Sequence, residues 1–198
     1  MADVVLLDLW DLSNKSELLL RSIQPRPPDD PCPAPRRPAR RPVCESLLIV
    51  QYIDEAWPDV APRLLPRDPF ARAQARFWAG FVDKKVFDCQ TRLWKSNGAA
   101  LEQAKRDTIE ALEALEAELG SKDYFGGEDL GFVDVALAPF TSWFRTYEEC
   151  GGFSVAEHCP GLVAWADRCR GREDVASALA DPDKVRSRRS SGTSKGCW

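Results

Sequence analysis

The sequence predicts an α+β protein in which a short N-terminal part with strand character precedes an all-helical C-terminal domain. Val4 to Leu9 is a short apolar run, which is typical of one strand. Residues 25–42 contain eight prolines and no Leu, Ile, Val or aromatic residue, so they can form neither a central strand nor a helix. Beyond residue 64, apolar residues recur at helical spacing over several long stretches.

The N-terminal part is expected to contain two helices separated by this proline-rich segment. Ser13 is a suitable cap for a helix that runs through Leu20. Residues 23–41 have almost no apolar surface to bury, which predicts an extended or disordered connector. Glu45 and Ser46 then open a second helix, whose apolar residues recur at helical spacing: Ile49, Val50, Ile53 and Trp57.

Asp68-Pro69 predicts the start of a long helix, with the aspartate as its N-cap and the proline at its first position. Asn97-Gly98 is expected to end this helix. We expect its buried side to consist of two adjacent rows, one of Phe70, Ala73, Phe77 and Phe81, the other of Trp78, Val82, Val86 and Leu93.

Further helices complete the predicted C-terminal domain. One runs from Leu101 to Leu119, with Leu112, Leu115 and Leu119 in register and Gly120 as its stop. The next begins at Gly131-Phe132-Val133-Asp134 and is expected to kink at Pro139. Pro160 opens another, and Glu173–Leu179 forms the last short one. The Pro160 helix is predicted to bury Leu162, Trp165, Ala166 and Cys169.

The composition excludes several classes of protein. A formal net charge of −4 argues against nucleic acid as the main partner. No apolar run reaches the ~18–20 residues that a membrane-spanning helix needs, and the acidic start (Asp3, Asp8) is a poor secretory signal. Seven cysteines without a CxxC pair favour a reduced, cytoplasmic protein. The single histidine, His158, makes a zinc site improbable.

Several segments resemble plant glutathione transferases, and most closely those of the tau class. They are PVCESLLIVQYIDEAW (42–57), LLPRDPFARAQARFWAGFVDKKV (64–86), YFGGEDLGFVDVALAPFTSWF (124–144) and CPGLVAWADRC (159–169), which occur in the family's order. A shorter match upstream covers Asp11 to Ser22. The resemblance implies a thioredoxin-like, glutathione-binding domain that is incomplete in residues 1–56, an all-helical domain in residues 64–183, and a disordered basic tail in residues 184–198.

The resemblance also implies the activity: conjugation of glutathione, as co-substrate and without a further cofactor, to small hydrophobic electrophiles in detoxification. Homodimers, or heterodimers with related subunits, are a possible assembly. Glu45 and Ser46 match the residues that bind the γ-glutamyl end of glutathione in the family. The N-terminus of a helix favours binding of a carboxylate, and the hydroxyl of Ser46 adds a further donor to it. The carboxylate of Glu45 can bind the ammonium group of the same ligand. The alternative is an ordinary helix start.

The chain departs from the family's pattern at the catalytic turn. The serine that activates the thiol in the tau class, and the cis-proline loop, have no match in this sequence. Ser13 matches a position after the second strand, and Cys32 lies where no helix can start, so neither is assigned a catalytic role. We therefore expect impaired activity. The alternative is a catalytically silent protein that binds hydrophobic ligands or pairs with intact subunits.

In the family the electrophile binds between the two domains, against the long helices. The aromatic residues that could line this site are Trp78, Phe81, Trp94, Trp143 and Phe144. At helical spacing, aromatic residues of this kind belong more often to the core than to the wall of a ligand site.

Overall fold

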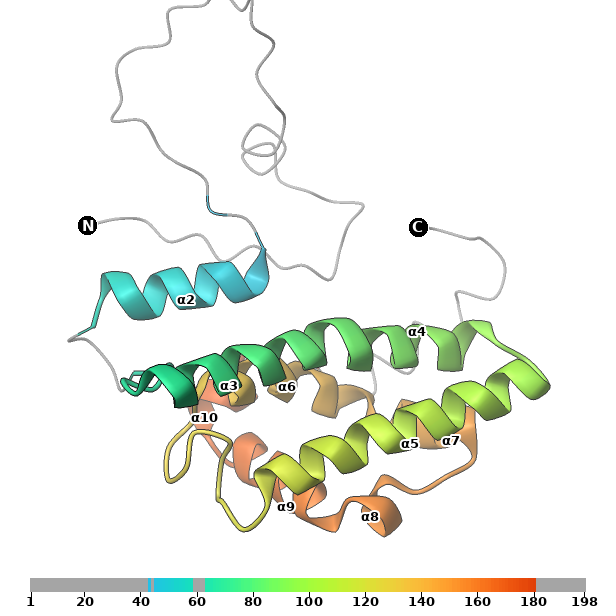
Figure 1. Ribbon diagram of the computed structural model, residues 1–198. Helices are drawn as coiled ribbons and strands as arrows, with labels where there is room; N and C mark the ends of the chain where they lie inside the picture. Colours follow the sequence, from blue (N-terminus) through green and yellow to red (C-terminus); the bar gives the residue numbers. More distant parts are fainter. Residues whose placement is uncertain (1–42, 44, 59–62, 181–198) are drawn as a thin grey trace, which may run out of the picture. The chain divides into compact units, whose positions relative to one another are not determined.

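The computed structural model describes residues 43, 45–58 and 63–180 (Figure 1). The predicted strand at 4–9, the helix at 13–20, the connector at 23–41 and the tail at 184–198 lie outside these residues. The chain divides into two units, residues 1–49 and 50–198. The described part of the first unit contains the beginning of α2, and the second unit contains the other described helices.

The described residues are helical, with a single β-type pairing between Tyr124 and Gly127. A π-helical stretch (Val82–Val86) joins α3 to α4, and a 3-10 stretch (Ala138–Trp143) joins α6 to α7. The α-helices are α2 (Ser46–Ala56), α3 (Pro69–Phe81), α4 (Phe87–Lys95), α5 (Ala99–Leu119), α6 (Phe132–Leu137), α7 (Phe144–Gly151), α8 (Val155–His158), α9 (Pro160–Arg170) and α10 (Glu173–Ala176).

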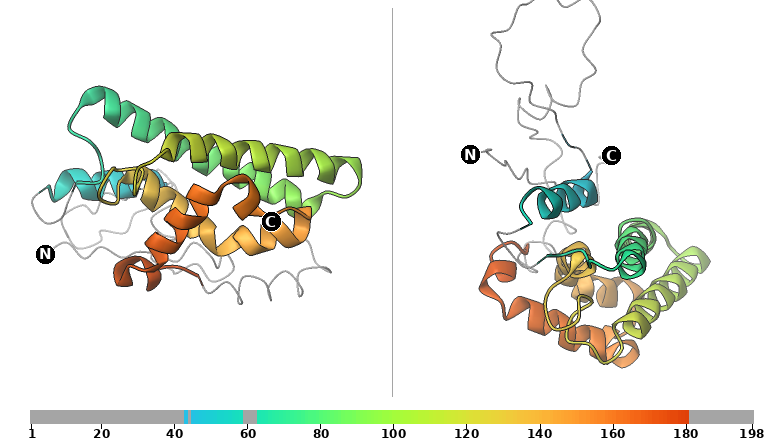
Figure 2. Two further views of the ribbon diagram at one scale, coloured as in Figure 1. Left: turned by 90° about the horizontal axis from the view of Figure 1, so that it is seen from below. Right: turned by 60° about the vertical axis from the view of Figure 1, so that its left-hand side comes forward.

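The long helical run from α3 to α4 begins as predicted. Asp68 is its N-cap, and the Asp68 carboxylate accepts a hydrogen bond of 2.8 Å from the backbone N–H of Ala71. Pro69 occupies the first turn, where the missing N–H costs nothing. The run ends at Lys95, just before the predicted stop. It lies beside α5, which in turn packs against α9 (Figures 1 and 2).

One of the two rows predicted to be buried on this run is wrong for Phe70, Ala73 and Phe77, whereas its fourth member, Phe81, is partly buried and packs against the core. Phe70 and Phe77 are 72% and 61% exposed, whereas Ala79, Val82 and Val86 are at most 2% exposed. Each residue turns a helix by about 100°, so Phe77 lies about 160° around the axis from Ala79 and faces away when Ala79 faces the core. An amphipathic helix buries only one stripe of its surface against the core. Both predicted rows are apolar, so the sequence alone does not show which of them is buried.

The other predicted helices of the domain are confirmed with small changes. Gly120, at φ 56°, ends α5, whose Leu112, Leu115 and Leu119 are buried. In α9 the four buried residues are those predicted. At Pro139 the chain passes from α6 into the 3-10 stretch, as expected for a proline kink. Helix α10 ends at Ala176, three residues earlier than expected, and α8 was not predicted.

Asp134 is the polar centre of this domain. Its fully buried carboxylate accepts four hydrogen bonds: from the N–H groups of Phe125 (2.9 Å), Gly126 (3.0 Å) and Gly131 (2.8 Å), and from Nε1 of Trp165 (2.7 Å). Burial raises the pKa of Asp134, and the four donors oppose that rise. The predicted cap, Asp134 to Gly131, is therefore confirmed as one of four contacts that join the glycine-rich loop, α6 and α9.

Glu116 caps α9 from a distant part of the chain. Its carboxylate, on α5, accepts hydrogen bonds from the backbone N–H groups of Gly161 (2.8 Å) and Leu162 (2.5 Å). These are two of the N–H groups that the first turn of a helix leaves without an intrahelical partner. A negative charge at this end is also favoured by the helix dipole. The contact fixes α9 against α5.

Candidate functional site

The N-terminal end of α2 carries the two residues predicted to bind glutathione. The carbonyl of Glu45 accepts the first helical hydrogen bond, at 2.9 Å from the N–H of Ile49, so Glu45 is the N-cap and Ser46 the first helical residue. The N–H groups of Ser46, Leu47 and Leu48 consequently have no partner within the helix. Glu45 and Ser46 are both exposed. This helix end therefore offers backbone donors, a hydroxyl and a carboxylate to a ligand.

The backbone conformation of Glu45 could not be predicted from its residue type. Its φ is 72°, and it is the one non-glycine residue with positive φ in the described part of the chain. A residue with a side chain held in this region costs roughly 1–3 kcal/mol, and such residues cluster at ligand-binding sites. Strain at the residue directly before Ser46 is an observation independent of the sequence match.

The C-terminal half of α2 is tied to the segment that follows it. Asp54, 9% exposed, accepts a hydrogen bond of 2.6 Å from the N–H of Leu64. The carbonyl of Leu64 accepts one of 2.9 Å from the N–H of Phe132, the first residue of α6. On the exposed side, Arg76 of α3 donates to Gln51 at 3.0 Å and pairs with Glu55 at 3.6 Å.

The five aromatic residues proposed for the electrophile site fall into two groups. Trp78 and Phe81 make an edge-to-face contact on α3, with ring centroids 5.4 Å apart. Trp94 of α4 packs on Trp143, with centroids 4.6 Å apart and an interplanar angle of 36°. Trp94 follows Phe81 by 13 residues, or about 20 Å along a helical run. Phe81 and Trp94 therefore lie at different positions along this helical run.

The second group contains an unsatisfied polar atom. Nε1 of Trp94 is buried and has no hydrogen-bond partner among the described residues. Buried donors are nearly always paired, so this N–H calls for an explanation. Trp94 and Trp143, like Trp78 and Phe81, are partly buried and pack against the hydrophobic core. Phe144, by contrast, is 7% exposed and packs in the core against Tyr147, which fits the alternative of a core position.

The buried cysteines have the properties of inert thiols. Cys89, Cys159 and Cys169 are at most 1% exposed, and burial raises the pKa of Cys159 and of Cys169 to about 12. Thiolate is the reactive form, so these groups are protected at neutral pH. Cys32 and Ser13 lie outside the described residues. In the described ranges no cluster of three or more metal-ligating side chains occurs, and no helix is long and apolar enough to cross a membrane.

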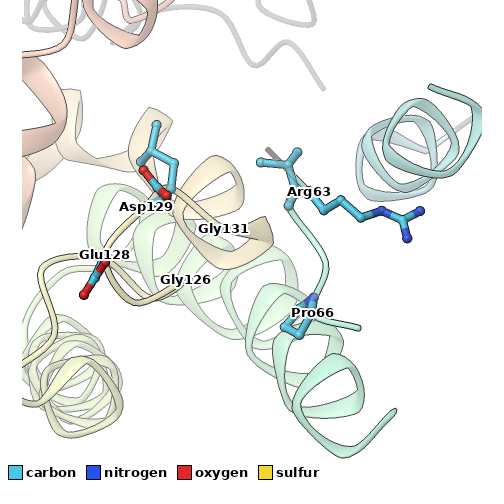
Figure 3. Close-up of a pocket in the computed structure, with 8 residues that line it drawn as sticks. Arg63, Pro66, Gly126, Glu128, Asp129 and Gly131 are labelled. Atoms are coloured by element: carbon cyan, nitrogen blue, oxygen red, sulfur yellow. The ribbon is translucent and has the colours of Figure 1, made fainter. Parts of the chain in front are cut away.

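A groove lies between the segment 63–66 and the glycine-rich loop 126–131 (Figure 3). Figure 3 shows that Arg63 extends away from Glu128 and Asp129, so these charged groups do not converge on a ligand position. The Leu64–Phe132 backbone hydrogen bond links the same two parts of the chain. We assign the groove no binding role.

Comparison with known proteins identifies the family. The family model "Glutathione S-transferase, C-terminal domain" matches residues 98–168. Probable glutathione S-transferase parC of Nicotiana tabacum is 51% identical over 175 residues, which are 88% of this chain and 77% of the relative. Glutathione S-transferase U19 of Arabidopsis thaliana is 49% identical over 88% of this chain and 78% of that protein. The chain belongs to the tau-class plant glutathione transferases.

Solved structures of this class confirm the α+β fold. The crystal structure of rice GST1 in complex with glutathione superposes with a TM-score of 0.77 at 45% identity, covering 91% of this chain and 81% of that chain. A tau-class enzyme from mango gives a TM-score of 0.74 at 31% identity, with 91% and 83% covered.

The chain spans only part of the length of these relatives: 77% of parC, 78% of U19 and 64% of parA from Nicotiana tabacum, a relative with 54% identity. Proteins of this family use glutathione as co-substrate. The comparisons give no support to the expected impairment or to the silent alternative.

Proposed function

We propose that this tau-class chain binds glutathione at the start of α2 and conjugates it to small hydrophobic electrophiles. The observation that carries the proposal is the left-handed backbone of Glu45 directly before Ser46, at a helix end with free N–H groups. Residues held in this strained region of backbone conformation cluster at ligand-binding sites, and Glu45 lies at an exposed helix start.

The geometry suits the γ-glutamyl group, which carries an α-carboxylate and an α-ammonium on one carbon. The carboxylate binds the free N–H groups of the first turn and the hydroxyl of Ser46, with help from the helix dipole. The carboxylate of Glu45 binds the ammonium group. The reaction further requires glutathione as thiolate, whose formation needs a nearby donor or cation. No described residue is assigned that role.

For the electrophile we propose the Trp94–Trp143 pair. These rings are partly buried and pack on each other, and the buried N–H of Trp94 has no hydrogen-bond partner among the described residues. Trp78 and Phe81 are the alternative. The pair offers apolar surface with one directional polar group, which is the usual make-up of a small-molecule site.

An assay with glutathione and a chromogenic aryl halide tests this proposal. We expect product to form faster than the spontaneous reaction, and Trp94→Leu to raise KM for the halide while KM for glutathione stays unchanged. Trp78→Leu is the matched control and should leave both constants near those of the wild type. The spontaneous rate alone would refute the transferase function, and an effect of Trp78→Leu alone would move the electrophile site to α3.

We propose that the chain pairs with a second copy or a related subunit through α3. Phe70 and Phe77 lie on one exposed face of this helix, two turns apart. Exposed aromatic residues on one face are typical of subunit interfaces.

The double variant Phe70→Glu/Phe77→Glu should sediment as a monomer at concentrations where the wild type is dimeric. Phe87→Glu, which changes an exposed Phe of α4, is the control, and an unchanged dimer in the double variant would exclude this face.

The location that we propose is the cytoplasm. Cys89, Cys159 and Cys169 are buried and form no disulfide among the described residues, which fits a reducing compartment.

A further inference from the structure

Asp54 is a buried carboxylate on the helix whose other end carries the proposed glutathione site. It is 9% exposed, and its Oδ1 accepts the 2.6 Å hydrogen bond from the N–H of Leu64. A charged group is buried at a cost unless it is well hydrogen-bonded. The next residue, Glu55, is exposed and pairs only loosely with Arg76. Asp54 is thus the strong attachment of this part of α2, since exposed ion pairs contribute little.

The attachment continues through one residue into the core of the helical domain. Leu64 donates its N–H to Asp54 and accepts a 2.9 Å hydrogen bond from Phe132 through its carbonyl. Phe132 is the first residue of α6, and Asp134 fixes this helix start with four hydrogen bonds. Asp54 is therefore joined through Leu64 to the start of α6, by one hydrogen bond from backbone to side chain and one between backbone groups.

Helix α2 runs without interruption from Ser46 to Ala56. Ser46 and Asp54 are eight residues apart, or about 12 Å along the axis. The backbone hydrogen bonds of α2 keep it straight over this distance. A contact that fixes Asp54 therefore also limits the movement of the first turn of the helix.

We propose that Asp54 is a positioning residue for glutathione: through Leu64 and α6 it holds α2 so that Glu45 and Ser46 keep their ligand-binding conformation. This inference rests on the proposed function. Asp54 itself does not touch the ligand.

The test compares Asp54→Ala, which removes the acceptor, with Asp54→Asn, which keeps a side-chain oxygen for the N–H of Leu64. Two controls are matched to it. Glu55→Ala removes the neighbouring exposed carboxylate, and Glu116→Ala destabilises the domain by uncapping α9 far along the chain from α2. The measurements on the full chain are the glutathione Kd by calorimetry, amide hydrogen exchange of residues 46–53, and Tm.

We expect Asp54→Ala to weaken glutathione binding by about 2- to 30-fold, the usual range for residues that act through a network. Exchange in residues 46–53 should become faster. Asp54→Asn and Glu55→Ala should retain the wild-type Kd, and Glu116→Ala should lower Tm with an unchanged Kd.

The outcomes separate this inference from the proposed function. If the wild type binds glutathione and Asp54→Ala binds equally well, the positioning role is refuted and the function stands. If Glu116→Ala weakens binding as much as Asp54→Ala does, the effect is general destabilisation, and the positioning role is again refuted. If the wild type does not bind glutathione, the proposed function fails and the inference fails with it.

Discussion

Replacing Asp134 by alanine is expected to lower the free energy of unfolding of this chain by about 4 kcal/mol. The substitution leaves four donors without their acceptor: the N–H groups of Phe125, Gly126 and Gly131, and the indole N–H of Trp165. The contacts with Gly131 and Trp165 are buried, whereas those with Phe125 and Gly126 are only partly buried. A buried donor without a partner costs about 1–3 kcal/mol, and the removal of a buried charge offsets part of this cost. A helix cap alone would contribute only about 1 kcal/mol.

Urea unfolding followed by circular dichroism measures this loss. Asp134→Asn keeps one carbonyl oxygen and should give a smaller decrease, whereas Asp129→Ala, on the exposed part of the same loop, should be close to neutral. A decrease of only about 1 kcal/mol for Asp134→Ala would show that the cap to Gly131 is the one contact that matters.

Replacing Ser46 by alanine is expected to weaken glutathione binding by about 10- to 100-fold. The hydroxyl of Ser46 stands at the first helical position and donates to the proposed carboxylate, and a hydrogen bond to a charged group contributes about 1.5–3 kcal/mol. The helix should remain intact, because Ser46 accepts no hydrogen bond that starts α2; that role falls to the carbonyl of Glu45.

Calorimetric titration with glutathione measures the effect. Cys32→Ala is the informative control, since that cysteine is assigned no function and its removal should leave Kd unchanged. Wild-type affinity in Ser46→Ala, or loss of binding in Cys32→Ala alone, would show that the ligand lies elsewhere.

Local signals in the sequence predicted where the helices begin and end. Asp68-Pro69 starts α3 and Gly120 ends α5 because the cap contacts join residues within one turn. The α9 face was also predictable, since only one face of Pro160–Arg170 is apolar. The start of α2, with Glu45 and Ser46, followed from the same kind of pattern.

Features that depend on contacts between distant parts of the chain could not be predicted from the sequence. The Glu116 cap of α9 joins residues 45 positions apart, and the Asp134–Trp165 contact joins residues 31 apart. Phe77 was placed in the core because an isolated helix with two apolar rows does not show which one its neighbours cover. The left-handed φ of Glu45 has no signal in its residue type, since glutamate does not favour that region.

The carboxylates of Glu116 and Asp134 share one consequence for biosynthesis. Both depend on α9, one for the N–H groups of its first turn and the other for the indole of Trp165. While a ribosome is still translating the earlier helices, neither acid has these partners, and a nascent domain cannot bury Asp134, which is fully buried in the folded chain, at low cost. Trp165 must therefore leave the exit tunnel before the chain can close its core, and folding of the helical domain is completed late in translation.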